Sequence, residues 1–442
     1  MNATPLQQFR IAVYQTFTRR GDAFFDLLDG LTVAGHVVSP VGLSEEAHFR
    51  RKFSSIYDVL RYAKNDEKKV RTLLQGFVSQ VSATLGGYGV YALDTTPEER
   101  PEARTLADRG CIRRDEDQSV QYGHKYSWLV RLVEWGTSWI APVSQKRVST
   151  DRTPSQVGIE QLEELDKEEP GQKIVVADSH YGNHFFLAVA LTLKRVWLLV
   201  RMRNNLNLRQ APLPPPEGKR RGPARKHGPK FKLAHPPRDP DQAAVFEILP
   251  NQPVRVEAWR ELHFMALASV VGTAIRIVFL RPDGTPRHKY PLWLFWTGPM
   301  TIALRDLCAM YLWRFAIEHA FRFMKQHLGL SANYSTLTPS IERWFDTCLL
   351  AYWQLLLMRS SVENACPAWY RRPSNTPSHP FTPWQVQRAA ASFLIKLGTP
   401  ACPPKPRGKG LGRPKGFHPA PRQRFKTVVK GKKQPKAALS PG

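Results

Sequence analysis

Tyr311-Leu-Trp-Arg314-Phe-Ala-Ile-Glu318-His-Ala-Phe-Arg-Phe-Met-Lys325 is the stretch of this 442-residue chain with the most informative polar spacing. At about 100° per residue, its tyrosine, first arginine, glutamate and final lysine fall within roughly 60° of one helical face. Most other positions are apolar, so four polar groups share one edge of a packed helix. Arg314 and Glu318 are also spaced as an i,i+4 pair, which can simply brace a helix. The spacing therefore predicts a helix over 311–325 that either braces itself or offers a polar stripe to a substrate.

The composition indicates a folded and strongly basic protein. Hydrophobic residues make up 42% of the chain, with 12 Trp and 22 Phe, which is typical of a globular body with a large core. A formal charge of +27 favours a polyanionic partner. We expect nucleic acid and no membrane, because no apolar run is long enough to span a bilayer. The N-terminus lacks a secretory pattern, so a cytoplasmic location is expected. The five cysteines form no C-x2-C pair, which argues against a zinc ribbon.

Apolar runs between residues 88 and 202 predict an α/β fold with a central sheet. Three strands, a helix, a strand, a helix and a strand are expected, at 88–93, 124–130, 139–148, 158–167, 173–177, 183–194 and 196–202. Asp94 and Asp178 directly follow the first and fourth strands. Strand ends of α/β sheets border the crevice where ligands bind, so both aspartates are candidate site residues. An aspartate at such a position can equally be a turn or cap residue.

A third carboxylate, Glu318, comes from the polar stripe of the later helix. Hard divalent cations such as Mg²⁺ prefer oxygen ligands of this kind. Two such ions can activate a water or a 3′-hydroxyl and stabilise the leaving oxygen of a phosphoryl displacement. Three acids in a basic chain therefore favour chemistry on phosphodiester bonds.

These features together resemble the DDE transposases of bacterial insertion sequences, in the subgroup defined by a Tyr-x2-Arg-x3-Glu-x6-Lys signature. The signature spacing is complete at 311–325, and the strand order and both aspartates agree with the family. The matching contexts are Tyr91-Ala-Leu-Asp94, Val176-Ala-Asp178-Ser-His-Tyr-Gly182 and Leu199-Val-Arg201-Met-Arg203. The resemblance covers roughly residues 85–360 and includes the apolar helix expected at 341–358.

The resemblance implies an RNase H-like catalytic core with a β-rich insertion. It implies that Asp94, Asp178 and Glu318 bind two Mg²⁺ ions, for which Mn²⁺ can substitute. It also implies that Tyr311, Arg314 and Lys325 contact DNA phosphates near the cleaved end, which suits their charge and hydrogen-bonding chemistry. The expected reaction is cut-and-paste transposition, in which a homodimer in a synaptic complex cleaves the transposon ends, sometimes through a hairpin, and joins them to target DNA.

Several aromatic and histidine residues remain ambiguous from sequence. Related enzymes hold a flipped base with an aromatic residue of the insertion, and the candidates, each of which can instead pack in a sheet, are Trp259, Trp293 and Trp296. His124 and His180 can polarise the nucleophile or be structural. Ser179 and His180 do not form a hydrolase triad, because no nucleophile elbow surrounds the serine.

The C-terminal region beyond Glu363 contains 16 Lys and Arg residues and no acid. It is expected to be largely disordered and to bind DNA electrostatically. Within it, Gly412-Arg-Pro-Lys-Gly416 resembles the core of an AT-hook, whose Arg413 and Lys415 would enter a narrow minor groove. A basic tail without sequence preference explains the same residues.

The sequence thus predicts five parts and one main function. The parts are a helical DNA-binding domain at 1–82, the first part of the RNase H-like core at 83–206, a basic and β-rich insertion at 207–290, the second part of the core at 291–362 and the basic tail at 363–442. The main hypothesis is a DNA transposase acting at the bacterial nucleoid. The alternatives are an RNase H-like nuclease without strand transfer and a domesticated DNA-binding protein.

Overall fold

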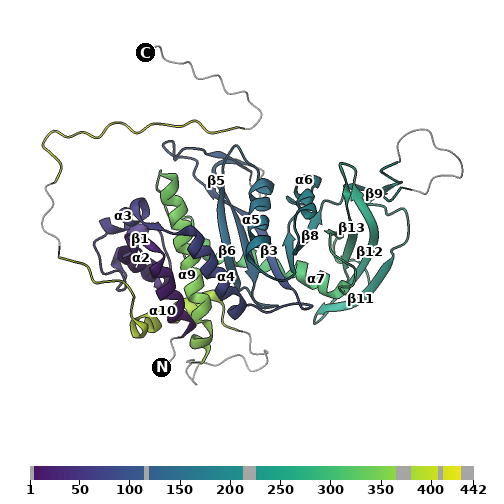
Figure 1. Ribbon diagram of the computed structural model, residues 1–442, viewed down its shortest axis with the longest axis horizontal. Coiled ribbons are helices and arrows are strands. Elements are labelled where there is room, and N and C mark those ends of the chain that lie inside the picture. The colour runs from purple at the N-terminus through teal and green to yellow at the C-terminus, as the bar shows by residue number, and fades with distance from the viewer. Residues whose placement is uncertain (1–3, 114–118, 213–224, 365–379, 407–411, 430–442) are drawn as a thin grey trace, which may run out of the picture.

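A twelve-stranded mixed sheet runs through the middle of the molecule, with most helices at one end of it (Figure 1). The computed structural model describes residues 4–113, 119–212, 225–364, 380–406 and 412–429. Parts of the expected basic and β-rich insertion and of the expected tail therefore lie outside the described residues. The strand order is β10-β9-β12-β13-β14-β8-β7-β3-β5-β4, with β6 also paired to β5 and β11 to β12. The last strand in this order, β4, spans Gly110–Arg113.

Five strands at the centre of this sheet correspond to the five that the sequence predicted. They are β3 (Gly89–Glu99), β5 (Val120–Leu132), β6 (Ile140–Val148), β7 (Lys173–Ala177) and β8 (Val196–Met202). β6, β5 and β3 are antiparallel neighbours, whereas β3, β7 and β8 are parallel. All five residues of β7 are buried, as expected for a parallel strand covered on both faces. The predicted α/β fold class is confirmed, and the five expected strands are present, with the short strand β4 added between the first two.

Helix α5 (Pro154–Glu168) covers one face of these strands. It begins with a capping box in which the Thr153 hydroxyl accepts from the Gln156 backbone N–H. Gly158 lets the helix lie close to β3, because a Cβ there would come within 2.8 Å of the Leu93 side chain. Helices α7 (Leu304–Trp313) and α8 (Phe315–Gln326) follow the last strand.

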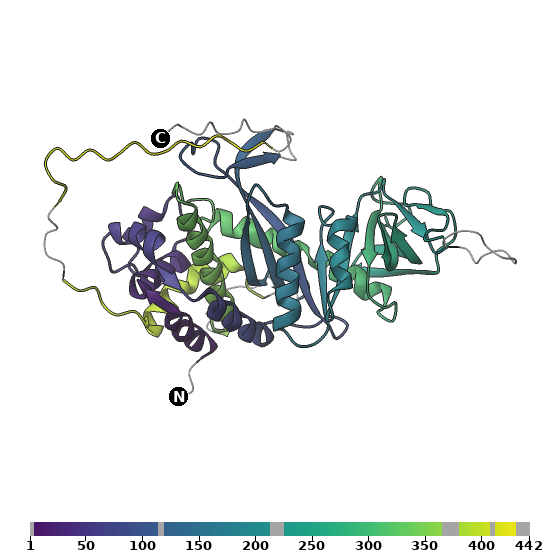
Figure 2. The ribbon, with the colours of Figure 1, turned by 45° about the horizontal axis from the view of Figure 1, so that its top comes forward.

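The N-terminal part consists of helices packed around the long helix α9 (Thr338–Asn364), as Figures 1 and 2 show. They are α1 (Pro5–Gln15), α2 (Gly21–Val33), α3 (Ser54–Tyr62) and α4 (Glu67–Val81), with the short elements β1 (Phe17–Arg19), η1 (Pro40–Glu45) and β2 (Lys64–Asn65). Buried Arg10 donates to Asp29 of α2 and to Gln354 of α9. This buried polar contact joins the N-terminal helices to α9, which comes much later in the chain. None of the helices in the described part of the chain combines the length and the apolarity needed to cross a membrane.

The insertion is a set of strands that extends the core sheet on the side of β8. The strands are β9 (Asn207–Gln210), β10 (Lys230–Lys232), β11 (Gln242–Leu249), β12 (Gln252–Phe264) and β13 (Leu267–Phe279), and β14 (Leu292–Trp296) joins β13 to β8. Trp259, Trp293 and Trp296 are all at most 1% exposed. The Trp259 and Trp293 rings pack 5.3 Å apart, so the packing interpretation of these tryptophans matches the structure.

Three of the expected elements that differ in their boundaries bear on the site. β3 does not end at Asp94 but continues to Glu99, because the long strand β5 still pairs with it there. The helix expected over 311–325 divides at Arg314, where two i→i−3 hydrogen bonds tighten the chain between α7 and α8. The helix expected at 183–194 is a short α-helix, α6 (His184–Leu187), followed by the 3-10 turn η2 (Ala188–Leu191).

Part of the C-terminal region expected to be largely disordered is a helix. α10 (Pro383–Leu397) begins with a capping box between Thr382 and Gln385 and packs against α2 and α9. Buried Val386, Ala390 and Leu394 form its inner face. This apolar stripe explains why the segment folds despite the basic composition around it.

Candidate active site

Asp94 and Asp178 lie side by side because of the register between two parallel strands. Leu93 on β3 is opposite Ala177 on β7, and this is the last pair that the two strands form. Asp94 directly follows Leu93 and Asp178 directly follows Ala177, so both aspartates come just after the point where β7 ends. The tertiary structure therefore produces the strand-end arrangement for Asp94, although its own strand continues.

Arg314 brings the third carboxylate to this place. Its Nη1 donates to Asp94 Oδ2 at 3.0 Å and its Nη2 donates to Glu318 Oε1 at 2.6 Å. Arg314 is 5% exposed, so its guanidinium forms a buried bridge between strand β3 and helix α8. The i,i+4 pair expected from sequence thus exists, but it is one half of a contact that also holds the catalytic candidate Asp94.

The two aspartates differ in how readily they ionise. Burial raises the pKa of Asp94 to about 6; the Arg314 charge opposes this, while Asp178 and Glu318 add to it. Burial also acts to raise the pKa of Asp178, but hydrogen bonds from His180 and the charges of His180 and Arg314 outweigh it and hold that pKa below its usual value. The electrostatic coupling indicates that the three carboxylates share one environment.

Two further residues of the polar stripe are turned toward the protein. Tyr311 is 2% exposed, and the guanidinium of Arg314 lies 5.8 Å from its ring centroid. Its buried hydroxyl has no hydrogen-bond partner among the described residues. Lys325 donates to the Pro97 carbonyl at 3.2 Å. Burial lowers the pKa of Lys325, and the charges of Glu98 and Glu99 oppose this effect. Glu318, whose side chain is 45% exposed, is the residue of the stripe most open to solvent.

The two histidines have different surroundings. His180 Nδ1 lies 2.8 Å from Asp178 Oδ2, and the His180 backbone N–H donates to the other carboxylate oxygen. This contact raises the pKa of His180, partly against burial. His124 is 2% exposed and its Nε2 contacts the Ala107 carbonyl. The geometry suits a role for His180 in orienting Asp178, whereas His124 has structural contacts.

One site residue was not singled out from sequence. Tyr181 is buried, and its hydroxyl lies 2.9 Å from the Thr95 hydroxyl. It thus joins the residue after Asp94 to the turn that follows Asp178. The signal available in the sequence was its place three residues after Asp178, in the same turn.

The donor chemistry of the three carboxylates suits a hard divalent cation. In the part of the chain that the structure describes, however, no three His, Cys, Asp or Glu side chains are arranged to hold a metal ion. The Arg314 guanidinium supplies the positive charge between Asp94 and Glu318 instead. The donor set therefore fits such an ion in kind, and Arg314 would have to move for these oxygens to converge on it.

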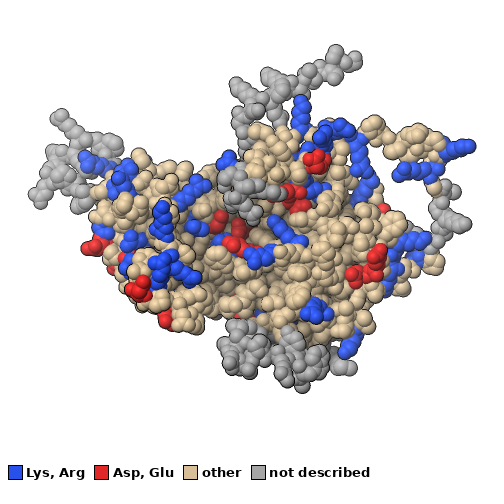
Figure 3. All heavy atoms as spheres, turned by 180° about the vertical axis from the view of Figure 1, so that it is seen from behind, with Lys and Arg blue, Asp and Glu red and all other residues tan. Residues whose placement is uncertain are grey.

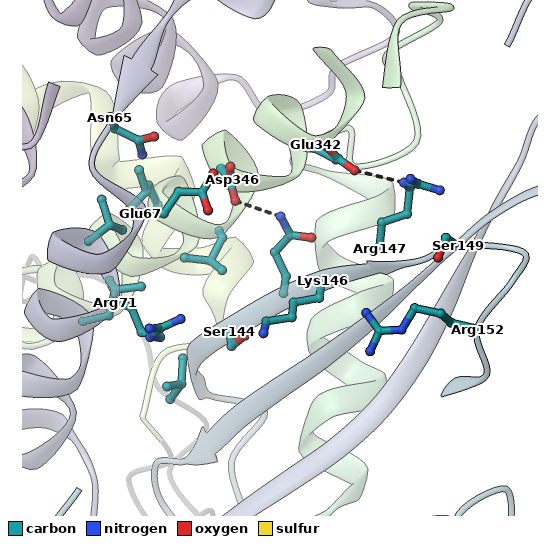
Figure 4. Close-up of a pocket in the computed structure, with 16 residues that line it drawn as sticks. Asn65, Glu67, Arg71, Ser144, Lys146, Arg147, Ser149, Arg152, Glu342 and Asp346 are labelled. Atoms are coloured by element: carbon teal, nitrogen blue, oxygen red, sulfur yellow. Dashed lines mark hydrogen bonds and ion pairs between the residues drawn. The ribbon is translucent and has the colours of Figure 1, made fainter. Parts of the chain in front are cut away.

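A second group of charged residues surrounds a cavity of about 460 Å³ between α4, β6 and α9 (Figure 4). Its basic residues are paired with acids of the same chain, in the contacts Arg71–Glu168, Lys146–Glu164 and Arg147–Glu342 at 2.8 to 2.9 Å. Because these charges are neutralised in place, we interpret the cavity as an ion-pair network that joins the helices to the sheet.

Asp346→Asn in this cavity is expected to raise the free energy of unfolding above pH 6. Burial raises the pKa of Asp346 from 3.8 to about 6, opposed by the Gln145 hydrogen bond. The folded state thus favours the protonated acid, whose stabilising contribution is complete below about pH 4 and lost as pH rises through about 6. We expect a gain of about 1 to 2 kcal/mol at pH 8, limited because the cavity reaches solvent.

Urea unfolding at pH 4 and pH 8 measures this effect. Asp239→Asn, at an exposed position, serves as the control and should change the free energy of unfolding at neither pH. An equal gain in the free energy of unfolding at pH 4 and pH 8 would contradict a raised pKa of Asp346 as the cause of the effect.

Comparison with known families and structures gives two matches. Residues 12–263 match a family model described as DDE superfamily endonuclease, which covers more than half of the chain and includes Asp94 and Asp178 but ends before Glu318. A chain of the cryo-EM structure of a piggyBac transposase synaptic complex with hairpin DNA is similar, with 11% identity and a TM-score of 0.44, over 90% of this chain and 83% of that chain. No curated protein matches the sequence.

Proposed function

Because the chain belongs to the DDE superfamily of endonucleases, we propose that it is a transposase that cleaves and joins DNA strands at the ends of an insertion sequence. The observation that carries this proposal is the Arg314 bridge. It joins Glu318, which lies outside the matched segment, to Asp94 at the edge of the matched core. A third carboxylate from a late helix, placed beside two strand-end aspartates, is what strand cleavage by this chemistry requires.

In this proposal Asp94, Asp178 and Glu318 would hold the divalent ions, Mg²⁺ or Mn²⁺. When bound, such ions lower the pKa of an attacking water or 3′-hydroxyl and stabilise the leaving oxygen. His180 keeps the Asp178 carboxylate oriented through the contact at its Oδ2. The contact between the hydroxyls of buried Tyr181 and partly buried Thr95 links the backbone segments that follow the two aspartates.

Arg314, Tyr311 and Lys325 are proposed to bind the phosphates of the cleaved strand. Arg314 gives one nitrogen to Asp94 and the other to Glu318, and Lys325 contacts the Pro97 carbonyl of β3. A guanidinium can exchange either carboxylate for a phosphate, because both oxyanions accept its hydrogen bonds. A phosphate arriving at Glu318 would therefore compete for the guanidinium of Arg314. This exchange would release Glu318 and Asp94 at the moment when the substrate is present.

The partners in this proposal are transposon-end DNA, target DNA and a second copy of the chain. The formal charge of +27 supports a polyanionic substrate. Joining two transposon ends to one target requires two active sites, so we propose a homodimer in the synaptic complex.

The proposal is tested with a supercoiled plasmid that carries the DNA flanking the gene on both sides. With Mg²⁺ the purified protein is expected to excise the DNA bounded by these two flanks and join it to a second plasmid. Nicking without excision or joining would favour an RNase H-like nuclease. DNA binding without any strand cleavage would favour a DNA-binding protein that no longer acts as an enzyme.

A further inference from the structure

A row of three charged residues crosses the ends of three parallel strands. The last row that β3, β7 and β8 form together consists of Leu93, Ala177 and Val200. The residues that directly follow these three are Asp94, Asp178 and Arg201. Neighbouring strands are about 4.8 Å apart, so the backbone of Arg201 is about 5 Å from that of Asp178. The register of the sheet therefore places a cation beside the two carboxylates.

The row points to the side of the sheet on which α7 and α8 lie. The Leu93 side chain lies against Gly158 of α5, on the other side of the sheet. Successive residues of a strand point to opposite faces, so Asp94 points away from α5. The guanidinium between α7 and α8 donates to Asp94, which shows that these helices are on that side. Residues of one row share a face, so Asp178 and Arg201 point the same way.

The charge of Arg201 is not neutralised by the described part of the chain. Within those residues its side chain makes no hydrogen bond and no ion pair, and it is the exposed residue of a strand that is otherwise buried or partly buried. Both oxygens of Asp178 are occupied by contacts with His180. Both oxygens of Asp94 accept from other donors, which are a backbone N–H and Arg314. Arg201 can therefore bind an external anion without breaking a contact.

A buried hydroxyl close to Arg201 also lacks a partner. Tyr311 is 2% exposed, and its hydroxyl has no hydrogen-bond partner among the described residues. Burial raises the pKa of this phenol, and the positive charges of Arg314 and Arg201 oppose the effect. The Arg201 guanidinium is thus within electrostatic reach of the hydroxyl. Buried polar groups are normally hydrogen-bonded, and a phosphate offers acceptor oxygens for both groups.

The backbone of Arg201 is fixed by the turn that follows Asp178. A Cβ on Gly182 in this turn would lie 2.1 Å from the Arg201 carbonyl oxygen, so the close approach needs a glycine. On its other side Arg201 pairs with Leu294 of β14. Only the arginine side chain has to become ordered when an anion binds, which limits the entropic cost of binding.

We propose that Arg201, together with the Tyr311 hydroxyl, binds the DNA phosphate next to the cleaved one, on the β8 side of Asp178. This inference rests on the proposed function, because it takes DNA as the substrate of the three carboxylates. Arg314 and Lys325 contact β3, at the other end of the row, so cations flank the carboxylates on both sides. Lys and Arg side chains spread over the face in Figure 3 also suit a polyanion.

Single-turnover cleavage tests this assignment, on a labelled duplex of about 30 base pairs that carries the cut position mapped in the plasmid assay. Arg201→Ala is expected to raise the half-saturating DNA concentration about tenfold, because a charge-assisted contact to a phosphate is lost. The maximal rate should change by less than about threefold, since the contact exists before and during cleavage. Arg201→Lys should raise the half-saturating concentration by less than about threefold, because it keeps the charge.

Arg195→Ala is the matched control. Arg195 is exposed and directly precedes β8, about 20 Å from Arg201 at the other end of the strand. The substitution removes the same charge from the same strand. It should leave the half-saturating DNA concentration within about twofold of the value for the unaltered protein.

Uncharged methylphosphonate linkages, introduced one at a time around the cut, identify the phosphate that Arg201 contacts. With the unaltered protein, one linkage beside the cut should raise the half-saturating concentration about tenfold. With Arg201→Ala the same linkage should raise it by less than about twofold, because the partner of that phosphate is already absent.

Two results would overturn the assignment of Arg201. One is an unchanged half-saturating DNA concentration in Arg201→Ala. The other is an equal effect of every methylphosphonate linkage in Arg201→Ala and in the unaltered protein. A failure of the proposed function is distinct from both, because the unaltered protein would then not cleave the duplex at all, and the inference would fall with it.

Discussion

Replacing Glu318 with Gln should lower DNA cleavage by at least about a thousandfold, or about 4 kcal/mol of activation free energy. Glutamine keeps the size of the side chain and can still accept from Arg314, but it lacks the negative charge that a divalent ion requires. The fold should therefore persist, since Glu318 is largely exposed and its partner Arg314 keeps its contact to Asp94. Asp94→Asn should give a loss of the same order.

Single-turnover cleavage of labelled DNA measures this prediction, with DNA affinity measured on the same preparations. Affinity should stay within about twofold, because the phosphate contacts of the rest of the molecule are unchanged. Glu247→Gln, an exposed carboxylate on β11, is the matched control and should retain full activity. Full activity of Glu318→Gln would mean that this glutamate is not a metal ligand.

Replacing Arg314 with Ala is the second large effect expected. The substitution leaves the buried Asp94 carboxylate without its cation, and we expect a loss of about 2 to 4 kcal/mol in the free energy of unfolding at pH 8. In the Asp94→Asn background the same substitution should cost at least about 1 kcal/mol less, because no charge is then left unpaired. Arg314→Lys should lower the free energy of unfolding by less than Arg314→Ala does, but should not restore the value of the unaltered protein, since one ammonium cannot span both carboxylates.

Divalent ions should partly reverse the loss of stability that Arg314→Ala causes. With the guanidinium removed, Mg²⁺ is the remaining cation for these oxygens, so it should raise the melting temperature of Arg314→Ala more than that of the unaltered protein. Two results would contradict the role given to the Arg314 bridge. One is a small loss of stability on Arg314→Ala that is the same with and without Asp94→Asn. The other is an equal rise in melting temperature with Mg²⁺ for Arg314→Ala and for the unaltered protein.

The strand order of the core was predictable because its signals are local. β7 and β8 are short, buried and bounded by polar residues, so their limits can be seen in the apolar pattern. The end of β3 was not predictable in this way, because pairing with β5 carries it past Asp94. Asp94 nevertheless lies at a strand end, since the neighbouring strand β7 ends beside it.

The bridge made by Arg314 depends on tertiary packing. Its i,i+4 relation to Glu318 is visible in the sequence, but its contact to Asp94 joins residues 220 positions apart. The burial of Tyr311 follows from the same packing. Sequence spacing could show which residues share a helical face, but not which protein surface that face meets.

The helix α10 carried a local signal that composition concealed. Thr382-Pro-Trp-Gln385 has the spacing of a capping box with Pro in the first turn. The prolines and basic residues on either side favoured disorder for the whole region. The strand-like contacts of Phe425 and Val428 with Arg104, Arg109 and Gly110 had no comparable signal, because they depend on an edge that another part of the chain provides.

Crystals grown with Mn²⁺ and a short DNA duplex test the central claim most directly, because manganese gives an anomalous signal. The account predicts an anomalous peak in contact with Asp94, Asp178 and Glu318, with the Arg314 guanidinium moved from Asp94 to a DNA phosphate. DNA bound with Arg314 still between Asp94 and Glu318, and no manganese peak at these carboxylates, would contradict it.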